Sequence, residues 1–340
     1  MALFLTTNTN YILIFSHLHE RYPHRSDSDM FYLILLFIII AVVLGISYYA
    51  FRLTFLAPPH LDANHYYVPD FDQFDAVHEG IKKSVARMAA RPYESINITS
   101  FDGSKLFARY YHAADNAPVH IMFHGYKSSS ILDCSGVSHF AQQLGHNAIV
   151  VDQRSHGQSE GNVITFGIKE RKDCLAWIEY AIKRFGDDVP IMLFGLSMGA
   201  ATVLMVNDLK LPKNVKGIMA DCPYSSPKEI IMKVAKEMHF PPHIMMPFVW
   251  LGGRVFGQFN LFESSAMEAI KSCKIPILIL HGNADELVPC DMSHKMVLSG
   301  AKDIQLELFE GAGHGLSYII LPDKYENTVV EFIKKFLSNS

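Results

Sequence analysis

The sequence predicts an α/β fold in which a mostly parallel, eight-stranded sheet carries helices on both faces. Short apolar runs alternate along the chain with amphipathic stretches of helical length, which favours a doubly wound sheet. Several of the runs are apolar throughout, as expected for parallel strands that are covered on both faces. About 280 residues follow the N-terminal region, enough for one α/β domain with a sizeable core.

The expected strands begin with an antiparallel hairpin over residues 93–107, where Asp102 and Gly103 are typical of a tight turn. The other strands are short apolar runs at residues 107–112, 119–124, 147–152, 191–196, 216–220, 275–281 and 304–309. Helices are expected where apolar residues recur at spacings of three and four. These stretches are residues 130–144, 168–185, 198–209, 290–299 and 323–337.

One insertion interrupts the alternation. About fifty residues precede the strand at 275–281, which is too long for a bare connection in a compact domain and is typical of a functional lid. We therefore expect a small helical cap over residues 226–272. Its apolar side chains would line a substrate pocket, because methionine adapts its shape to a ligand; they are Met245, Met246, Phe248 and Trp250. Ordinary packing against the edge of the sheet is the alternative.

The N-terminal region contains 21 consecutive residues without a charge, residues 31–51. A helix of this length spans roughly 31 Å, which matches the hydrocarbon core of a bilayer. Tyr48 and Tyr49 lie near its end, where tyrosine suits the membrane interface. We therefore expect a single-pass transmembrane anchor over residues 30–52. A cleaved signal peptide is the weaker interpretation, because its apolar region is shorter and follows basic residues.

The segments on either side of this anchor are less informative. Residues 1–29 show no coherent pattern, and Met30 directly precedes the apolar run, so we expect this segment to be untranslated or disordered. Residues 53–91 are expected to form a linker and a leading helix, and residues 92–340 the main domain. Arg21 and Arg25 precede the span and Arg52 follows it. This difference in positive charge is too small to decide on which side of the membrane the main domain lies.

A candidate nucleophile lies in the motif Gly195-Leu196-Ser197-Met198-Gly199, between an apolar run and a helix of small residues. A strand, a sharp turn and a helix are the context of a nucleophile elbow, in which flanking glycines leave room for a strained backbone. Gly157 to Gly161 matches the same pattern around Ser159, but it follows a polar loop and no helical periodicity begins after it. Ser197 is therefore the predicted nucleophile.

A serine hydroxyl needs a base within hydrogen-bond reach and a group that orients the base. With 17 histidines in the chain, the order serine, acid, histidine is the useful criterion. His314 follows the strand at 304–309 and is the predicted base, and Asp285 follows the strand at 275–281 and is the predicted acid. Asp221, which also ends a strand, and Glu286 are alternatives for the acid. His281 and His124 are expected to hold loops.

The negative charge that develops on a substrate oxygen requires donors that are already in place. One is expected to be the N–H of Met198, because the first residue of a helix has no helical partner for its N–H. The second is expected from the loop after the strand at 119–124, with the N–H of Tyr126 as the first choice. Gly125 in the same loop is expected to contact substrate.

Together these motifs resemble the α/β-hydrolase superfamily, and within it the serine aminopeptidase and monoacylglycerol lipase-like branch. The residues that carry the resemblance are His124-Gly125, Asp152 to Ser159, Gly195 to Gly199, His281-Gly282 with Asp285, and Gly313-His314. The similarity covers approximately residues 92 to 338. It implies a Ser-Asp-His triad that acts on esters, thioesters or amides, and it implies structural roles for Asp152, Arg154 and His156.

The expected activity is therefore acyl transfer to water, with no metal and no organic cofactor. A carboxylesterase or lipase is favoured by the anchor and the apolar cap; a peptidase for short peptides and a binding protein without turnover are the alternatives. A net charge of −4 gives no basic footprint for nucleic acid. Five cysteines without C-x-x-C spacing indicate neither a complete disulfide framework nor a zinc site.

Overall fold

The sheet of this protein has eight strands in the order β1-β2-β4-β3-β5-β6-β7-β8. The structure is a computed structural model that describes residues 27–58, 78–299 and 303–337. The strands are β1 (Glu94–Thr99), β2 (Lys105–Tyr111), β3 (Val119–Phe123), β4 (Asn147–Asp152), β5 (Ile191–Leu196), β6 (Val215–Asp221), β7 (Ile277–Gly282) and β8 (Ile304–Phe309). β2 pairs antiparallel with β1 and β4, and all other pairs are parallel. The predicted mostly parallel, eight-stranded sheet is thus confirmed.

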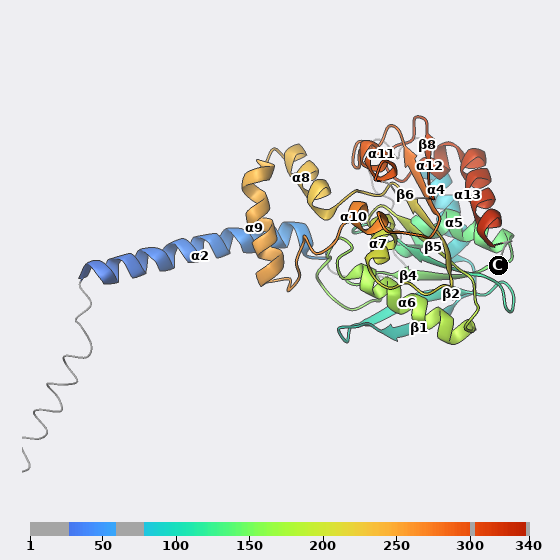
Figure 1. The fold of residues 1–340 in the computed structure, drawn as a ribbon, viewed down its shortest axis with the longest axis horizontal. Coiled ribbons are helices and arrows are strands. Elements are labelled where there is room, and N and C mark those ends of the chain that lie inside the picture. Colours follow the sequence, from blue (N-terminus) through green and yellow to red (C-terminus); the bar gives the residue numbers. More distant parts are fainter. Residues whose placement is uncertain (1–26, 59–77, 300–302, 338–340) are drawn as a thin grey trace, which may run out of the picture. The chain divides into compact units, whose positions relative to one another are not determined.

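Helices cover both faces of the sheet (Figure 1). α4 (His78–Ala89), α5 (Ser130–Gln143) and α13 (Pro322–Leu337) pack on one face. The other face carries α6 (Glu170–Phe185), α7 (Met198–Met205) with the 3₁₀ turn η1 (Val206–Asp208), α10 (Ala266–Ile270) and α11 (Asp291–Val297). The short helix α12 (Ser317–Ile320) precedes α13. The helix expected over residues 198–209 therefore ends earlier, where the chain tightens into the 3₁₀ turn.

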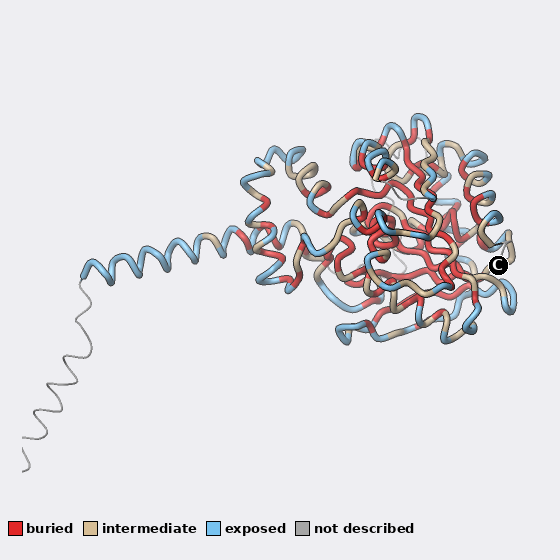
Figure 2. Tube along the Cα trace, viewed as in Figure 1, coloured by how far each residue is buried: buried red, intermediate tan, exposed pale blue. Residues whose placement is uncertain are grey.

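The strands form the core because their side chains alternate between the two faces. On β3, Ile121 and Phe123 belong to the apolar cluster under α6 and α7, whereas Met122 belongs to the cluster under α5 and α13. All five residues of β3 are buried, and Figure 2 shows the buried residues gathered in the interior of the second unit, residues 48–340. A strand that is covered on both faces has no need for polar alternation, which explains the continuous apolar runs in the sequence.

Local sequence signals explain where several helices begin. The Ser129 hydroxyl accepts the N–H of Leu132 at 3.2 Å and caps α5. In the same way the Ser226 hydroxyl accepts the N–H of Glu229 at 3.1 Å and caps α8 (Pro227–Glu237). Pro227 occupies the first turn of α8, where its missing N–H would have had no helical acceptor. These caps fix the entry of each helix into the fold.

Three helices lie in the insertion between β6 and β7. α8 is followed by α9 (Pro242–Val255), and α10 then returns the chain to the sheet beside α7. Met246 and Val249 of α9 are buried with Ile230 and Ile231 of α8 in the larger apolar cluster. The bounds 226–272 for a separate cap remain a prediction, but this segment is helical where the sequence analysis expected it to be.

The chain divides into two compact units, residues 1–47 and 48–340. The long helix α2 (Asp27–Phe55) begins in the first unit and ends in the second. Among the described residues, α2 is the one helix that is long and apolar enough to cross a bilayer. Its large apolar side chains from Met30 to Tyr49 are mostly exposed, with Phe37 at 73%. The expected segment 1–29 lies almost entirely outside the described residues.

Candidate active site

Ser197 lies at the sharp turn between β5 and α7. Its backbone has φ 55° and ψ −112°, a conformation that a residue with a side chain rarely adopts. The flanking glycines are required by close approaches of the backbone. A Cβ on Gly195 would lie 2.1 Å from the Gly199 carbonyl oxygen, and a Cβ on Gly199 would lie 2.2 Å from the Phe123 carbonyl oxygen. The strain is thus held by tight packing of β3, β5 and α7.

His314 lies between Ser197 and Asp285. Its Nε2 is 2.9 Å from the Ser197 Oγ, and its Nδ1 is 2.7 Å from the Asp285 Oδ2. Because an ionised carboxylate can only accept, the proton of the neutral ring resides on Nδ1. The Nε2 lone pair therefore faces the Ser197 hydroxyl and can accept its proton. Three side chains from the loops after β5, β7 and β8 form one hydrogen-bonded line.

Asp285 is held in its charged form. Burial alone would raise the pKa of Asp285, but hydrogen bonds from His281 and His314 and from the N–H of Val288 hold that pKa well below its usual range. Its Oδ1 accepts the N–H groups of Leu287 at 2.9 Å and Val288 at 2.8 Å. A carboxylate that stays ionised fixes the tautomer of His314 and can stabilise the imidazolium that forms when the ring takes a proton.

The two alternative acids lie in different surroundings. The Oδ2 of Asp221 accepts the Tyr325 hydroxyl at 2.8 Å, and its backbone carbonyl accepts the N–H of Ser197 at 2.8 Å. The Asp221 backbone carbonyl therefore helps to hold the strained turn at Ser197. Glu286 is exposed. Of the three candidate acids, Asp285 is the one that hydrogen-bonds to His314 among the described residues.

The raised pKa of Asp221 is expected to make the stability of the protein depend on pH. Burial raises the pKa of Asp221 to about 6, from 3.8 in an exposed carboxyl. The folded state therefore binds the proton of the Asp221 carboxyl more tightly than the unfolded state does. The contribution of this proton to the free energy of unfolding is full below pH 4 and is lost as the pH rises through 6. The loss amounts to about 3 kcal/mol. We expect the free energy of unfolding of Asp221→Asn, relative to the wild type, to improve by roughly that amount between pH 4 and pH 7.5.

Urea unfolding of both proteins in detergent at the two pH values measures this difference. Other titrating groups are common to both proteins and cancel in the comparison. A difference between the two proteins that does not change with pH would show that Asp221 keeps an ordinary pKa in the folded state.

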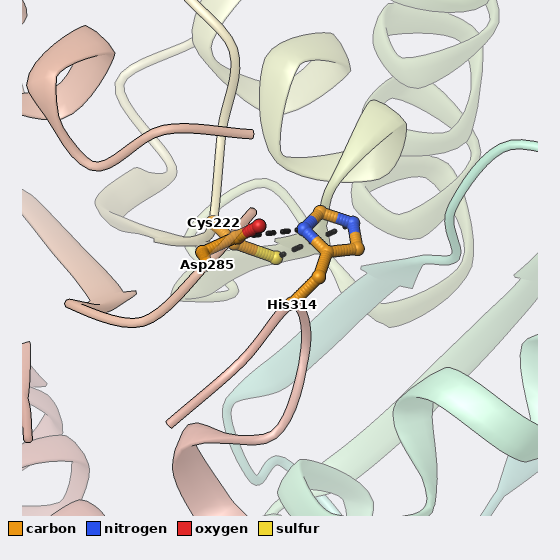
Figure 3. A group of neighbouring side chains, drawn as sticks. All are labelled: Cys222, Asp285 and His314. Carbon is orange, nitrogen blue, oxygen red and sulfur yellow. Dashed lines mark hydrogen bonds and ion pairs between the residues drawn. The ribbon is translucent and has the colours of Figure 1, made fainter. Parts of the chain in front are cut away.

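Three side chains at this site are potential metal ligands. The ligating atoms of Cys222, Asp285 and His314 lie within 4.8 Å of one another, and both Cys222 and Asp285 point toward the ring of His314 (Figure 3). The Cys222 Sγ is 4.0 Å from the His314 Nε2. Metal binding requires a thiolate, whereas burial raises the pKa of Cys222 well above its usual value. The carboxylate and both ring nitrogens already form the hydrogen-bonded line described above, so we assign the group to hydrogen bonding.

The loop after β3 offers one backbone donor toward Ser197. A Cβ on Gly125 would lie 3.4 Å from the Ser197 Cβ, so this loop contacts the elbow. The Gly125 N–H donates to Asp133 at 2.6 Å and the Lys127 N–H donates to the His156 Nε2 at 3.0 Å. Within the described residues, the Tyr126 N–H between them donates no hydrogen bond.

Met198, the first residue of α7, offers a second donor. Its N–H has no acceptor within the helix, and Ser197 makes no side-chain cap. The N–H groups of Tyr126 and Met198 are therefore both available to a substrate oxygen. Their role as an oxyanion hole stays a prediction.

Buried histidines hold this loop in place. The His124 Nε2 accepts the Gln153 N–H at 3.0 Å, so its Nδ1 carries the proton and donates to the Gly125 carbonyl at 2.8 Å. Burial lowers the pKa of His124 well below its usual value, which keeps the ring neutral. His156 accepts from Lys127 and donates through Nδ1 to the Arg154 carbonyl at 2.9 Å. These two rings link the loop after β3 to the turn after β4.

Asp133 was missed by the sequence analysis. Its Oδ2 accepts the Gly125 N–H and its Oδ1 accepts the Ser128 hydroxyl at 2.7 Å, so it fixes the loop next to the nucleophile. A single aspartate in the first turn of a helix resembles an ordinary helix-start residue, and only its position across from Gly125 reveals the contact.

The second G-x-S-x-G match lies in a buried turn. The Ser159 hydroxyl donates to the Asp152 carbonyl and accepts the Phe107 N–H at 2.8 Å. Arg154 in the same turn pairs with Asp173 at 2.6 Å and with Asp102 at 2.8 Å. No base faces Ser159 among its hydrogen-bond partners. These contacts are those of a structural turn.

Two cavities meet at Ser197. One of about 270 Å³ is lined by the loop after β3, by α5 and by the segment that follows His314, and it includes Asp133 and Ser128. The other, of about 240 Å³, lies under α8 and α9 and is almost entirely apolar. Ser197 and Tyr126 line both. An ester has two substituents on its reacting centre, and two separate cavities can each receive one of them.

The residues predicted to contact substrate fall in different places. Gly125 lines the first cavity and Met245 the second. Met246 and Trp250 line a depression of about 560 Å³ between α8, α9 and the loop that contains Phe262, on which Trp250 stacks with ring centroids 6.5 Å apart. Phe248 packs partly buried against the core and lines none of the three cavities. Helical rotation separates these neighbours, because consecutive residues point about 100° apart.

Comparison with known proteins shows which family the chain is similar to. Residues 115–268 match the sequence model of the family described as serine aminopeptidase, S33. The chain is 25% identical over 226 residues to the uncharacterized protein YqkD of Bacillus subtilis, covering 66% of this chain and 74% of that protein. It is 26% identical over 292 residues to the monoglyceride lipase of Mus musculus, covering 73% and 92%.

A solved structure gives the same fold. The esterase Pf2001 of Pyrococcus furiosus superposes with a TM-score of 0.62 at 21% identity, covering 83% of this chain and 97% of that chain. At this identity the likeness establishes the fold. The sheet order, the turn at Ser197 and the family match agree with it. The chain is therefore a hydrolase with the α/β-hydrolase fold, and its sequence is similar to the serine aminopeptidase, S33, family and to a monoglyceride lipase.

Proposed function

We propose that the protein is a membrane-anchored serine esterase that cleaves carboxylic esters with an apolar acyl group. The observation that carries this proposal is the hydrogen-bonded line from Ser197 through His314 to Asp285, beside an apolar cavity that Ser197 itself lines. The names of two similar proteins, a monoglyceride lipase and an esterase, agree with an ester substrate.

The reaction proceeds in two acyl-transfer steps. His314 Nε2 takes the proton of the Ser197 hydroxyl as its Oγ forms a bond to the ester carbonyl carbon. The oxygen of that carbonyl becomes negative and accepts the N–H groups of Met198 and Tyr126. The tetrahedral intermediate collapses, the bond to the alcohol oxygen breaks, and His314 returns the proton to the departing alcohol.

Water then releases the acyl group. It enters where the alcohol was, loses a proton to His314 Nε2, and attacks the acyl carbon. The bond to the Ser197 Oγ breaks, Oγ recovers the proton from His314, and the carboxylic acid departs. Asp285 remains ionised throughout, because its contacts hold its pKa well below its usual range.

Anchoring to a membrane is the second part of the proposal. The exposed apolar side chains of α2 form a far larger apolar surface than a soluble monomer normally shows. The uncharged stretch of residues 31–51 is also long enough to span a bilayer. A bilayer is the environment in which such a surface is stable.

A matched substrate panel tests the proposed chemistry. We expect the full chain in phospholipid vesicles to hydrolyse p-nitrophenyl acetate and p-nitrophenyl decanoate, and to cleave aminoacyl p-nitroanilides at least roughly a hundredfold more slowly, because an amide is the harder bond to cleave. The apolar cavity has no carboxylate in its lining to bind an α-amino group, and in the other cavity both oxygens of Asp133 already accept hydrogen bonds. Faster cleavage of the anilides would contradict the proposal and favour a peptidase.

A further inference from the structure

The last turns of α2 are built into the hydrolase unit. Ala50, Phe51 and Phe55 are 3%, 4% and 0% exposed. The Phe55 ring packs edge-on against Phe166 and Phe259, with centroids 5.9 and 5.0 Å apart. Buried aromatic contacts of this kind fix an element firmly. This end of the helix is therefore part of the hydrolase core as well as the end of a tether.

Hydrogen bonds hold the same turns against the active-site loops. The Tyr126 hydroxyl donates to the Thr54 carbonyl at 2.8 Å, and the Ile164 N–H donates to the Phe55 carbonyl at 2.8 Å. Tyr126 is also one of the two residues whose N–H groups are proposed to bind the substrate oxygen, and its N–H donates no hydrogen bond within the described residues. The end of α2 is thus one hydrogen bond away from the loop that approaches Ser197.

The apolar cavity of about 240 Å³ lies against this end of α2. Tyr49, Ala50, Leu53 and Thr54 line it, together with Ser197. The remaining lining comes mainly from apolar side chains of α8, α9 and the loop around Leu287. Tyr49 and Leu53 lie one helical turn apart on one face of α2, and they are 59% and 46% exposed. They therefore mark the open side of the cavity.

We propose that the end of the anchor helix is a wall of the acyl-binding cavity, so that Leu53 helps to set the length of acyl chain that the enzyme accepts. The inference rests on the proposed esterase function and names its substrate class as esters of medium and long fatty acids. The cavity touches the nucleophile, so a chain bound there carries its carbonyl to Ser197. The alcohol then occupies the other cavity, which holds the polar side chains of Asp133 and Ser128.

The size and surroundings of the cavity favour a hydrocarbon chain as its occupant. A dry cavity of about 150 Å³ holds one benzene ring, so one of this size holds on the order of ten carbon atoms. A longer chain leaves past Tyr49 and Leu53, two partly exposed residues of the lining. The carboxyl end of the chain is then the part that reaches Ser197.

Chain-length profiles of α2 variants test the inference. The full chain in phosphatidylcholine vesicles is assayed for kcat/KM on p-nitrophenyl acetate, decanoate and palmitate. We expect Leu53→Trp to lower the ratio of decanoate to acetate activity roughly tenfold or more, because the indole displaces about two methylenes of bound chain. Leu53→Ala enlarges the same space and is expected to raise the ratio of palmitate to decanoate activity.

Tyr48→Trp is the matched control. It places the same ring on the same helix, beside Phe256 and outside the cavity, because Tyr48 contacts Phe256 with centroids 5.1 Å apart. We expect it to keep the wild-type ratios. If Leu53→Trp and Leu53→Ala keep them too while the wild type hydrolyses these esters, the inference is wrong and the proposed function stands. If the wild type hydrolyses no ester of any length, the proposed function fails and the inference falls with it.

Discussion

Replacing Ser197 with alanine is expected to lower kcat for p-nitrophenyl esters by roughly 10⁴- to 10⁶-fold, while the free energy of unfolding changes little. The loss follows because, among the described residues, Ser197 has the hydroxyl that hydrogen-bonds to the His314 Nε2, at 2.9 Å. The fold should persist, since the contacts that hold the turn are made by the Ser197 backbone and by Gly195 and Gly199. Stopped-flow release of p-nitrophenol and thermal unfolding measure the two effects.

Ser159→Ala is the matched control for this prediction, because Ser159 lies in the second copy of the same five-residue pattern. Its hydroxyl donates to the Asp152 carbonyl and accepts the Phe107 N–H, so its loss is expected to reduce stability and to leave kcat of the folded fraction within a few-fold. Retention of wild-type kcat by Ser197→Ala would overturn the assignment of the nucleophile.

Asp285→Asn carries the second largest expected effect, a fall in kcat of about 10⁴-fold with little change in KM. An asparagine amide can donate to His314 Nδ1 and so favours the tautomer with its proton on Nε2, which can no longer accept from Ser197. Loss of the carboxylate also removes the charge that stabilises the imidazolium. Steady-state kinetics at pH 8 with p-nitrophenyl decanoate measure the change.

Asp221→Asn is the control for this second prediction. Its side chain accepts the Tyr325 hydroxyl at 2.8 Å, and an asparagine oxygen can accept the same bond. We expect kcat to fall by no more than roughly tenfold, because Asp221 does not contact His314 in the described structure. The opposite order of effects would make Asp221 the acid of the site.

Much of the fold could be predicted because a short apolar run of sequence is enough to predict each strand. The run at residues 191–196 has no polar side chain, and the run at residues 119–124 is apolar except for His120 and His124. In the structure both strands, β3 and β5, are buried under helices on both faces. Ser197 could be proposed as the nucleophile for the same local reason, since its glycines and the adjoining strand and helix all lie within a dozen or so residues.

The rest of the site depends on contacts between distant segments. Asp133 fixes the loop at Gly125 from the next helix, and Thr54 at the end of α2 accepts the Tyr126 hydroxyl across 72 positions of sequence. Such contacts cannot be predicted from a pattern of neighbouring residues. It also could not be predicted that Met246 and Trp250 line a different cavity from Met245, because an apolar helix with few polar residues does not show which of its faces meets which cavity.

The central claim is that Ser197 is a nucleophile activated by His314. The most direct test is to find which residue a serine-reactive fluorophosphonate labels. The full chain is treated with a fluorophosphonate, digested and analysed by peptide mass spectrometry. We predict one adduct, on the peptide that contains Ser197, and its loss in His314→Ala. An adduct on another serine, or an unlabelled Ser197 in a preparation that hydrolyses esters, would contradict the account.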